Sequence, residues 1–118
     1  MKRILVVDDE ANIREAVRFV LQEEDYEIME AENASDALRL AVERKPDLII
    51  SDVMMDNGNG FMLREILKED PVTASIPIIL MTGAAQGAGA WDSDPTIGYL
   101  VKPFTAAQLI EALNFKVK

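Results

Sequence analysis

The stretch ILVVDDE at residues 4–10 decides the class of fold that this sequence predicts. Its first four residues, from Ile4 to Val7, are apolar without interruption, which is typical of a strand buried on both faces of a parallel sheet. Two acidic residues, Asp8 and Asp9, follow directly. The carboxyl ends of the strands of an open parallel sheet lie at one edge, where ligands bind. The stretch therefore predicts an α/β protein with acidic groups at its ligand-binding edge.

Short apolar strands alternate with helix-period segments along the rest of the chain. Besides residues 4–7, strands are expected at 26–31, 48–50, 78–81 and 99–101. We therefore predict an α/β fold of the flavodoxin-like, doubly wound type, with a five-stranded parallel sheet in the order 2-1-3-4-5 and helices on both faces. The segment 26–31 alternates polar and apolar residues, as suits an exposed edge strand.

The ends of several helices are also marked in the sequence. Asn33 and Thr105 are residue types that cap helix N-termini, and each precedes a stripe of apolar residues at helical spacing. Pro46 and Pro71 are expected to end the second and third helices. No linker, repeat or low-complexity segment interrupts the pattern, so we expect one domain over residues 1–118.

The segment 84–97 breaks the alternation. A fourth helix is expected there, yet the segment contains Gly87, Gly89 and Pro95. Each interior glycine costs a helix about 1 kcal/mol relative to alanine, and proline costs more. We therefore expect a short or irregular fourth helix.

Composition restricts the chemistry that this chain can perform. The 118 residues include no cysteine and no histidine, which excludes disulfides, thiol nucleophiles, imidazole bases and the usual zinc sites. The net charge of −9 argues against direct binding of nucleic acid. The apolar run at 4–7 is too short for a signal peptide and no stretch is long enough for a membrane span, so we expect a cytoplasmic protein. Carboxylates are the main reactive groups that remain.

Polar residues follow four of the five predicted strands. They are Asp8 and Asp9, Asp52, Thr82 with Gly83, and Lys102 with Pro103. Three carboxylates, a hydroxyl and an ammonium group should therefore meet at one edge of the sheet. Carboxylates that lie close together repel unless a cation neutralises them, and oxygen ligands favour magnesium. Such a site predicts an aspartate that accepts a phosphoryl group.

These residues stand in motifs that resemble the receiver domain of response regulators in two-component signalling, including the single-domain chemotaxis regulators. The resemblance covers almost the whole chain. Five segments carry it in order: ILVVDDE at 4–10, DLIISDVMM at 47–55, the turn ending at Gly60, IPIILMTG at 76–83 and YLVKPF at 99–104.

The resemblance implies an acceptor and a metal site. Asp52 matches the phosphoacceptor of the family. Asp9 would bind Mg²⁺ directly, Asp8 would act mainly through a bound water, and Met54 would contribute its backbone carbonyl. Mn²⁺ is the alternative ion.

The resemblance also implies phosphate-binding and switch residues. Thr82 and the backbone N–H of Gly83 would contact the phosphoryl oxygens, and Lys102 would bridge the phosphate. The bond from Lys102 to Pro103 would be cis. Tyr99 matches the aromatic switch residue, which turns inward as the hydroxyl of Thr82 moves toward the phosphate.

Two departures from the family pattern bear on output. Asp56 stands where the family usually has proline. The segment 84–97, which contains Trp91, lacks the amphipathic helix that family members commonly use for dimers or partner contacts. Output through that surface is therefore open, as is the oligomeric state.

The implied function is a phosphorylation-dependent switch. Its partners would be a histidine kinase or a phosphotransfer protein, followed by an effector domain or a downstream protein, without direct binding to nucleic acid or membrane. The chain would not be an enzyme beyond catalysing its own phosphoryl transfer and dephosphorylation. The alternative is a receiver-like docking module that works without phosphorylation; the complete set of acids, hydroxyl and lysine weighs against it.

An enzyme or cofactor binder on the same fold is a poorer interpretation. A flavodoxin-type phosphate loop needs Ser, Thr or Gly after the first strand, where Asp8 and Asp9 would repel phosphate. No G-x-G-x-x-G sequence follows a strand. Residues 55–60 imitate a calcium loop, but Met55 occupies its first ligand position and Ile66 its twelfth.

Overall fold

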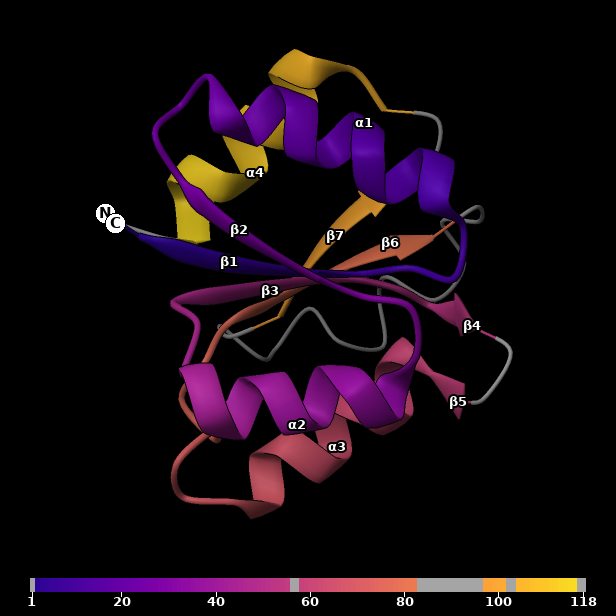
Figure 1. The fold of residues 1–118 in the computed structure, drawn as a ribbon, viewed down its shortest axis with the longest axis vertical. Coiled ribbons are helices and arrows are strands. Elements are labelled where there is room, and N and C mark those ends of the chain that lie inside the picture. The colour runs from indigo at the N-terminus through magenta and orange to yellow at the C-terminus, as the bar shows by residue number, and fades with distance from the viewer. Residues whose placement is uncertain (1, 56–57, 83–96, 102–103, 117–118) are drawn as a thin grey trace.

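A five-stranded parallel sheet forms the centre of the molecule (Figure 1). The computed structural model describes residues 2–55, 58–82, 97–101 and 104–116. The strands, in spatial order, are β2 (Glu27–Ala31), β1 (Arg3–Val7), β3 (Leu48–Asp52), β6 (Ile78–Thr82) and β7 (Ile97–Val101). This order confirms the predicted doubly wound topology, and the polar strand β2 lies at an edge, as expected.

In the described part of the chain, two helices cover each face of the sheet. Figure 1 shows α1 (Ala11–Gln22) and α4 (Ala106–Lys116) on one side, and α2 (Ala34–Arg44) and α3 (Gly60–Glu69) on the other. Because the sheet is covered on both sides, its inner strands must be apolar throughout, and Ile4 to Val7 are indeed all fully buried. The uninterrupted apolar runs in the sequence are thus a direct consequence of the three-layer arrangement.

The alternation of side chains along each strand divides the core into two halves. Leu5 and Val7 of β1 pack in the cluster beneath α2 and α3, whereas Ile4 and Val6 pack in the cluster beneath α1 and α4. Strand β3 follows the same rule, with Ile50 in the α1–α4 half of the core. The direction of a residue at the end of a strand can therefore be inferred from its place in this alternation.

Local hydrogen bonds define the helix ends that the sequence marked. The side chain of Asn33 accepts a bond from the backbone N–H of Asp36 at 2.8 Å, which confirms Asn33 as the N-cap of α2. Thr105 and Gln108 form a reciprocal pair at the start of α4: Thr105 Oγ1 accepts from the N–H of Gln108 at 3.1 Å, and Gln108 Oε1 accepts from the N–H of Thr105 at 2.9 Å. Helix α2 ends on Lys45, just before the proline that was expected to stop it.

The chain between β3 and α3 adds a small element that the sequence did not predict. Strands β4 (Met54–Met55) and β5 (Gly58–Asn59) form an antiparallel pair, whereas only a loop was expected. Strands of two residues are too short for hydrophobic periodicity to reveal. The weak fourth helix expected at 84–97, and Trp91 within it, lie outside the described residues except for Ile97, which begins β7.

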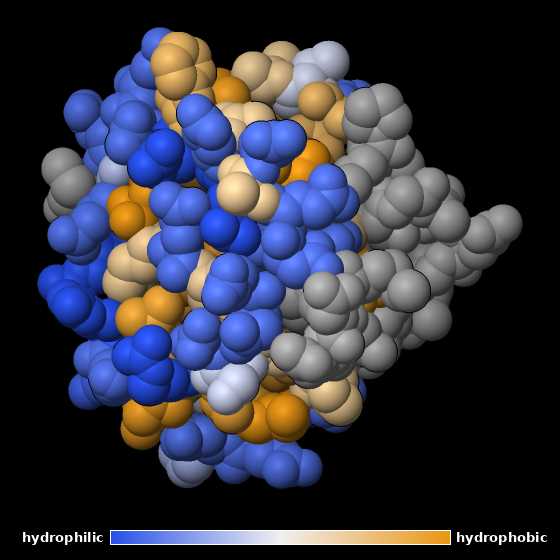
Figure 2. Space-filling view, turned by 45° about the vertical axis from the view of Figure 1, so that its right-hand side comes forward, coloured by the Kyte–Doolittle hydropathy of each residue, from blue (hydrophilic) through white to orange (hydrophobic). Residues whose placement is uncertain are grey.

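The face of the molecule drawn in Figure 2 is mainly polar among the residues that the structure describes. Figure 2 shows one face, where hydrophilic side chains predominate and apolar ones form separate small groups. Among the helices that the structure describes, none is long and apolar enough to cross a membrane.

Candidate functional site

Three consecutive acidic residues meet where β1 ends. The carboxylate oxygens that Asp8, Asp9 and Glu10 can offer to a ligand lie within 4.8 Å of one another. Asp8 is fully buried, Asp9 is half-buried and Glu10 is exposed. The sequence predicted the first two as site residues and missed Glu10, although it continues the same acidic run.

A tight turn explains why Glu10 joins this group. Asp8 Oδ1 accepts a hydrogen bond from the backbone N–H of Glu10 at 2.9 Å, and the N–H of Asp8 donates to the carbonyl of Ala31 on β2 at 3.1 Å. Helix α1 starts directly afterwards, and its first free N–H groups carry partial positive charge that favours nearby carboxylates. The acid group is therefore held between a strand end and a helix N-terminus.

Asp52 ends the neighbouring strand β3. The register pairs Val7 with Ser51, so Asp8 and Asp52 come next on two adjacent strands, which are spaced by roughly 4.8 Å in any sheet. Asp52 is 7% exposed. Alternation places Asp52 on the same face of the sheet as Ile50, and Asp8 on the same face as Val6. The fold thus brings the predicted acceptor beside the predicted metal ligands.

The remaining predicted residues can be placed only in part. Thr82 ends β6 and pairs along the backbone with Val101, the residue before Lys102. Tyr99 lies within β7 opposite Leu80, and Met54 lies in β4. Gly83, Lys102 and Pro103 lie outside the described residues. The roles assigned to all of these residues stay predictions.

Arg14 is a neighbour of the acid group that the sequence did not indicate. Its Nη1 donates to the backbone carbonyl of Asp8 at 2.6 Å, and its Nε bonds to Glu30 Oε1 of β2 at 3.2 Å. Arg18 approaches the other oxygen of Glu30 at 3.5 Å. The sequence does place a positively charged residue one helical turn after Glu10. Charged residues on a helix usually face solvent, so this spacing does not by itself predict a contact with the acid group.

The donor set decides what the site can bind. Asp8, Asp9, Glu10 and Asp52 supply only hard oxygen atoms, which suit magnesium or manganese and not soft metals. Two unit charges 4 Å apart near a protein surface repel by about 4 kcal/mol. A divalent cation would relieve that repulsion while leaving Asp52 at the rim as a nucleophile. The site is suited to binding a cation together with a phosphoryl group.

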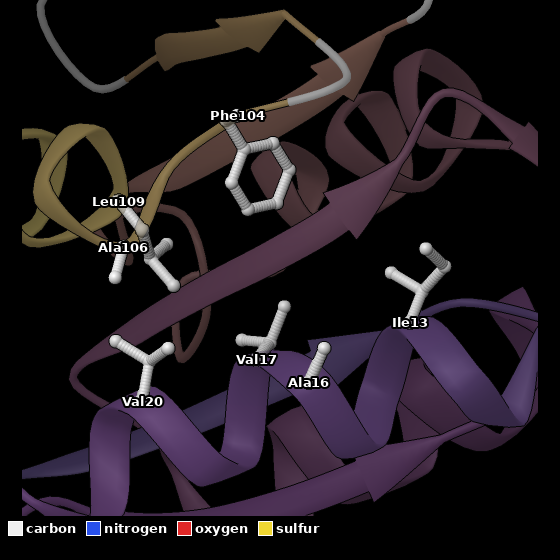
Figure 3. Close-up of a pocket in the computed structure, with 7 residues that line it drawn as sticks. All are labelled: Ile13, Ala16, Val17, Val20, Phe104, Ala106 and Leu109. Carbon is white, nitrogen blue, oxygen red and sulfur yellow. The ribbon is translucent and has the colours of Figure 1, made fainter.

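An apolar groove lies away from the acid group. A groove of about 470 Å³ separates α1 from the start of α4. Figure 3 shows the side chains of α1 pointing across it toward those that precede and begin α4; the lining residues are Ile13, Ala16, Val17, Val20, Phe104, Ala106 and Leu109. None of them carries a charge, so the groove offers nothing to hold a phosphate.

Several known proteins are similar to this chain in sequence or in structure. The phosphate regulon transcriptional regulatory protein PhoB of Pseudomonas aeruginosa is 41% identical over 96% of this chain and 50% of that protein, so the chain spans about half of the relative's length. Protein PilH of the same organism is 31% identical over 97% of this chain and 96% of its own. The response regulator TrrA of Thermotoga maritima, solved in complex with Mg²⁺ and BeF, superimposes with a TM-score of 0.84 at 38% identity, covering 97% of each chain.

Membership of a family follows from the extent of one further match. The model described as the response regulator receiver domain matches residues 4–114, which include the carboxyl ends of β1, β3, β6 and β7. The chain belongs to the response regulator receiver domain family.

Proposed function

We propose that this chain is a signalling switch in which Asp52 accepts a phosphoryl group from a histidine kinase or a phosphotransfer protein. The observation that carries the proposal is the position of Asp52, nearly buried at the end of β3 and one strand away from Asp8. The exposed side of this carboxylate can approach a phosphoryl group. A cation held by the acids that follow β1 would lie on its other side.

The bonds made and broken in the transfer belong to the donor and to Asp52, and a divalent cation would supply only charge. A carboxylate oxygen of Asp52 attacks the phosphorus atom of the donor's phosphohistidine, an O–P bond forms and the P–N bond breaks. The electron pair of the broken bond stays on the imidazole nitrogen, and the imidazole takes up a proton from solvent water. The product is an acyl phosphate. In slow autodephosphorylation, water attacks the phosphorus and Asp52 leaves as a carboxylate. Positioning and charge neutralisation supply most of the acceleration in both steps.

The acids of β1 fit Mg²⁺, with Mn²⁺ as the alternative. Their oxygens are close enough to share one ion, and the chain has no cysteine or histidine that would favour a softer metal. Bound there, the ion supplies positive charge to the equatorial oxygens of the transferring phosphoryl group. We assign direct coordination to Asp9 and Asp52, coordination through water to Asp8, and a backbone carbonyl ligand to Met54.

The switch itself would involve the ends of β6 and β7. Thr82 and the N–H of Gly83 would bind the phosphoryl oxygens, Lys102 would bridge the phosphate, and Tyr99 would turn inward as Thr82 moves. Phosphorylation would thereby shift the population between two conformations of that edge of the molecule. The continuous β6–β7 pairing from Ile78 to Thr82 gives a route by which a movement at Thr82 reaches Tyr99.

The biological setting proposed is a cytoplasmic two-component system or phosphorelay. The relatives are of two lengths, which correspond to two kinds of output. PhoB is about twice as long as this chain and is named as a transcriptional regulator, whereas PilH has almost the same length as this chain. Phosphorylated Asp52 would act either on a linked effector domain or on a separate downstream protein.

The test is phosphorylation of the purified chain by acetyl phosphate with Mg²⁺, followed by mass spectrometry. We expect the mass of one phosphoryl group to be added to the wild-type chain, and none to Asp52→Asn. Asp25→Asn is the matched control, because Asp25 is an exposed residue in a left-handed turn that asparagine also tolerates. A wild-type chain that gains no mass would contradict the proposal and favour a docking module that works without phosphorylation.

A further inference from the structure

We propose that Arg14 is a positioning residue of the acid site, and that it sets the affinity of the site for a divalent cation by holding the peptide between Asp8 and Asp9. The inference deepens the proposed function and rests on it for the identity of the site. Arg14 itself does not coordinate the cation in this proposal.

The guanidinium of Arg14 joins three elements. It extends from α1, donates from Nη1 to the carbonyl of Asp8 at 2.6 Å, and is tied through Nε to Glu30 on β2 at 3.2 Å. Its side chain is only 16% exposed. A short, charge-assisted bond from a rigid planar group in a mostly buried place is stronger and better oriented than an exposed ion pair.

The carbonyl that Arg14 holds belongs to the peptide that leads into Asp9. Its orientation therefore determines where the Cα atom of Asp9 lies and in which direction its carboxylate leaves the backbone. The carboxylate of Asp8 is held independently, because its Oδ1 accepts from the N–H of Glu10 at 2.9 Å. Mg²⁺ demands nearly octahedral ligand geometry, so a small displacement of Asp9 would weaken binding. Removing a residue that orients metal ligands typically costs tenfold to a hundredfold in metal affinity.

Whether loss of Arg14 weakens or strengthens the binding of the cation distinguishes a positioning role from a purely electrostatic one. Arg14 carries a positive charge beside the acid group, so its loss would strengthen the binding of a cation if charge alone mattered. Loss of an oriented carbonyl would weaken that binding instead. Arg18 provides a matched control, because it pairs with the same Glu30, at 3.5 Å, and carries the same charge on the same helix. Among the residues that the structure describes, Arg18 pairs with Glu30 and makes no bond to the backbone of Asp8.

The experiment is a magnesium titration by isothermal calorimetry on the full chain. Compared with wild type, we expect Arg14→Ala to raise the dissociation constant for Mg²⁺ roughly tenfold and Arg18→Ala to leave it within about twofold. Circular dichroism establishes that each variant is folded at the temperature of the titration. If Arg14→Ala is unfolded, Glu30→Ala serves in its place, because it removes the carboxylate that anchors the guanidinium; we then expect a rise smaller than tenfold.

Two outcomes would overturn the inference: a folded Arg14→Ala chain with unchanged or tighter binding of Mg²⁺, or equal losses in Arg14→Ala and Arg18→Ala. Failure of the proposed function gives a different result. In that case the wild-type chain gains no phosphoryl group at Asp52, whatever the order of the magnesium affinities among the variants.

Discussion

The metal-binding role proposed for Asp9 is opposed to the stability of the metal-free chain. Asp9 is half-buried, and its carboxylate lies within 4.8 Å of those of Asp8 and Glu10. Without a cation this charge is repelled by its neighbours. We predict that Asp9→Ala raises the free energy of unfolding of the metal-free chain by about 1 kcal/mol, less than the full Coulomb energy because water screens part of it. Urea unfolding in the presence of a chelator measures the change.

The control for Asp9→Ala removes an acidic charge elsewhere. Glu24 is exposed after the end of α1, so Glu24→Ala removes one negative charge just as Asp9→Ala does and should change stability by less than about 0.5 kcal/mol. The same Asp9→Ala chain should no longer accept a phosphoryl group from acetyl phosphate. A clear loss of stability in Asp9→Ala would show that this carboxylate makes a structural contact that outweighs the repulsion.

Lys45 is a residue in a strained conformation. It caps the C-terminus of α2 with a φ of 48° and a ψ of 65°, the left-handed region that favours glycine. We predict that Lys45→Gly stabilises the chain by about 0.5–1 kcal/mol, since relief of the Cβ clash exceeds the added entropy of the unfolded chain. Urea unfolding measures the gain. Lys45→Ala keeps the Cβ atom and should give none; equal gains in both variants would assign the effect to the charge.

The residues at the acid site differ in how well the sequence predicts them. Asp8, Asp9 and Asp52 could be found because each follows a buried strand, and parallel strands end at a common edge. Glu10 and Arg14 could not, because their directions depend on a turn and on side-chain rotamers. Those are decided by contacts such as the bond from Arg14 to the carbonyl of Asp8, which join residues of different elements.

At the scale of the element, the features that could be predicted are those that depend on contacts within a few residues of one another. Asn33 and Thr105 were expected to cap helices and do so, because a cap depends on the side chain and on backbone N–H groups three residues away. Strand lengths were underestimated: β3 reaches Asp52 and β7 begins at Ile97, because pairing with neighbouring strands extends them past the apolar run. The β4–β5 pair likewise depends on backbone pairing that hydrophobic spacing does not encode.

The capping pair at the start of α4 supports a prediction for that helix. Thr105 and Gln108 satisfy each other's backbone N–H groups, and both residues are exposed, so their substitution disturbs no core contact. We predict that Thr105→Ala costs about 1 kcal/mol of stability, within the usual range for a lost N-cap. Thr105→Ser retains the hydroxyl and should cost much less. Chemical unfolding compares them, and equal losses would mean that the methyl group of Thr105 and not its cap stabilises α4.

At the scale of the whole molecule, the order of the strands was predictable from burial. Strands β1 and β3 contain uninterrupted apolar runs because neighbouring strands and helices cover them, whereas β2 mixes polar and apolar residues and is partly exposed because it is an edge strand. Once the edge is known, right-handed crossovers leave few arrangements of five parallel strands. The same arrangement gathers the strand ends that carry the acids, so the fold and the location of the site were predicted by one argument.

The net charge of −9 complicates any measurement of metal binding through stability, because salt alone screens the repulsion among surface carboxylates. A specific site must therefore stabilise the chain beyond the effect of ionic strength. An ion that binds the folded chain at a hundred times its dissociation constant, and not the unfolded chain, adds about 2.7 kcal/mol.

We predict that saturating Mg²⁺ raises the melting temperature of the wild-type chain by on the order of 10 °C over a sodium chloride solution of equal ionic strength. The physical reason is that folding holds the acids at the end of β1 within 4.8 Å of one another and brings Asp52 to the end of the neighbouring strand β3. Differential scanning calorimetry measures the shift, and Asp9→Ala should respond to the two salts alike. Equal melting temperatures of the wild-type chain in both salts would mean that its carboxylates hold no cation, and the acceptor at Asp52 would then lack the charge that its chemistry requires.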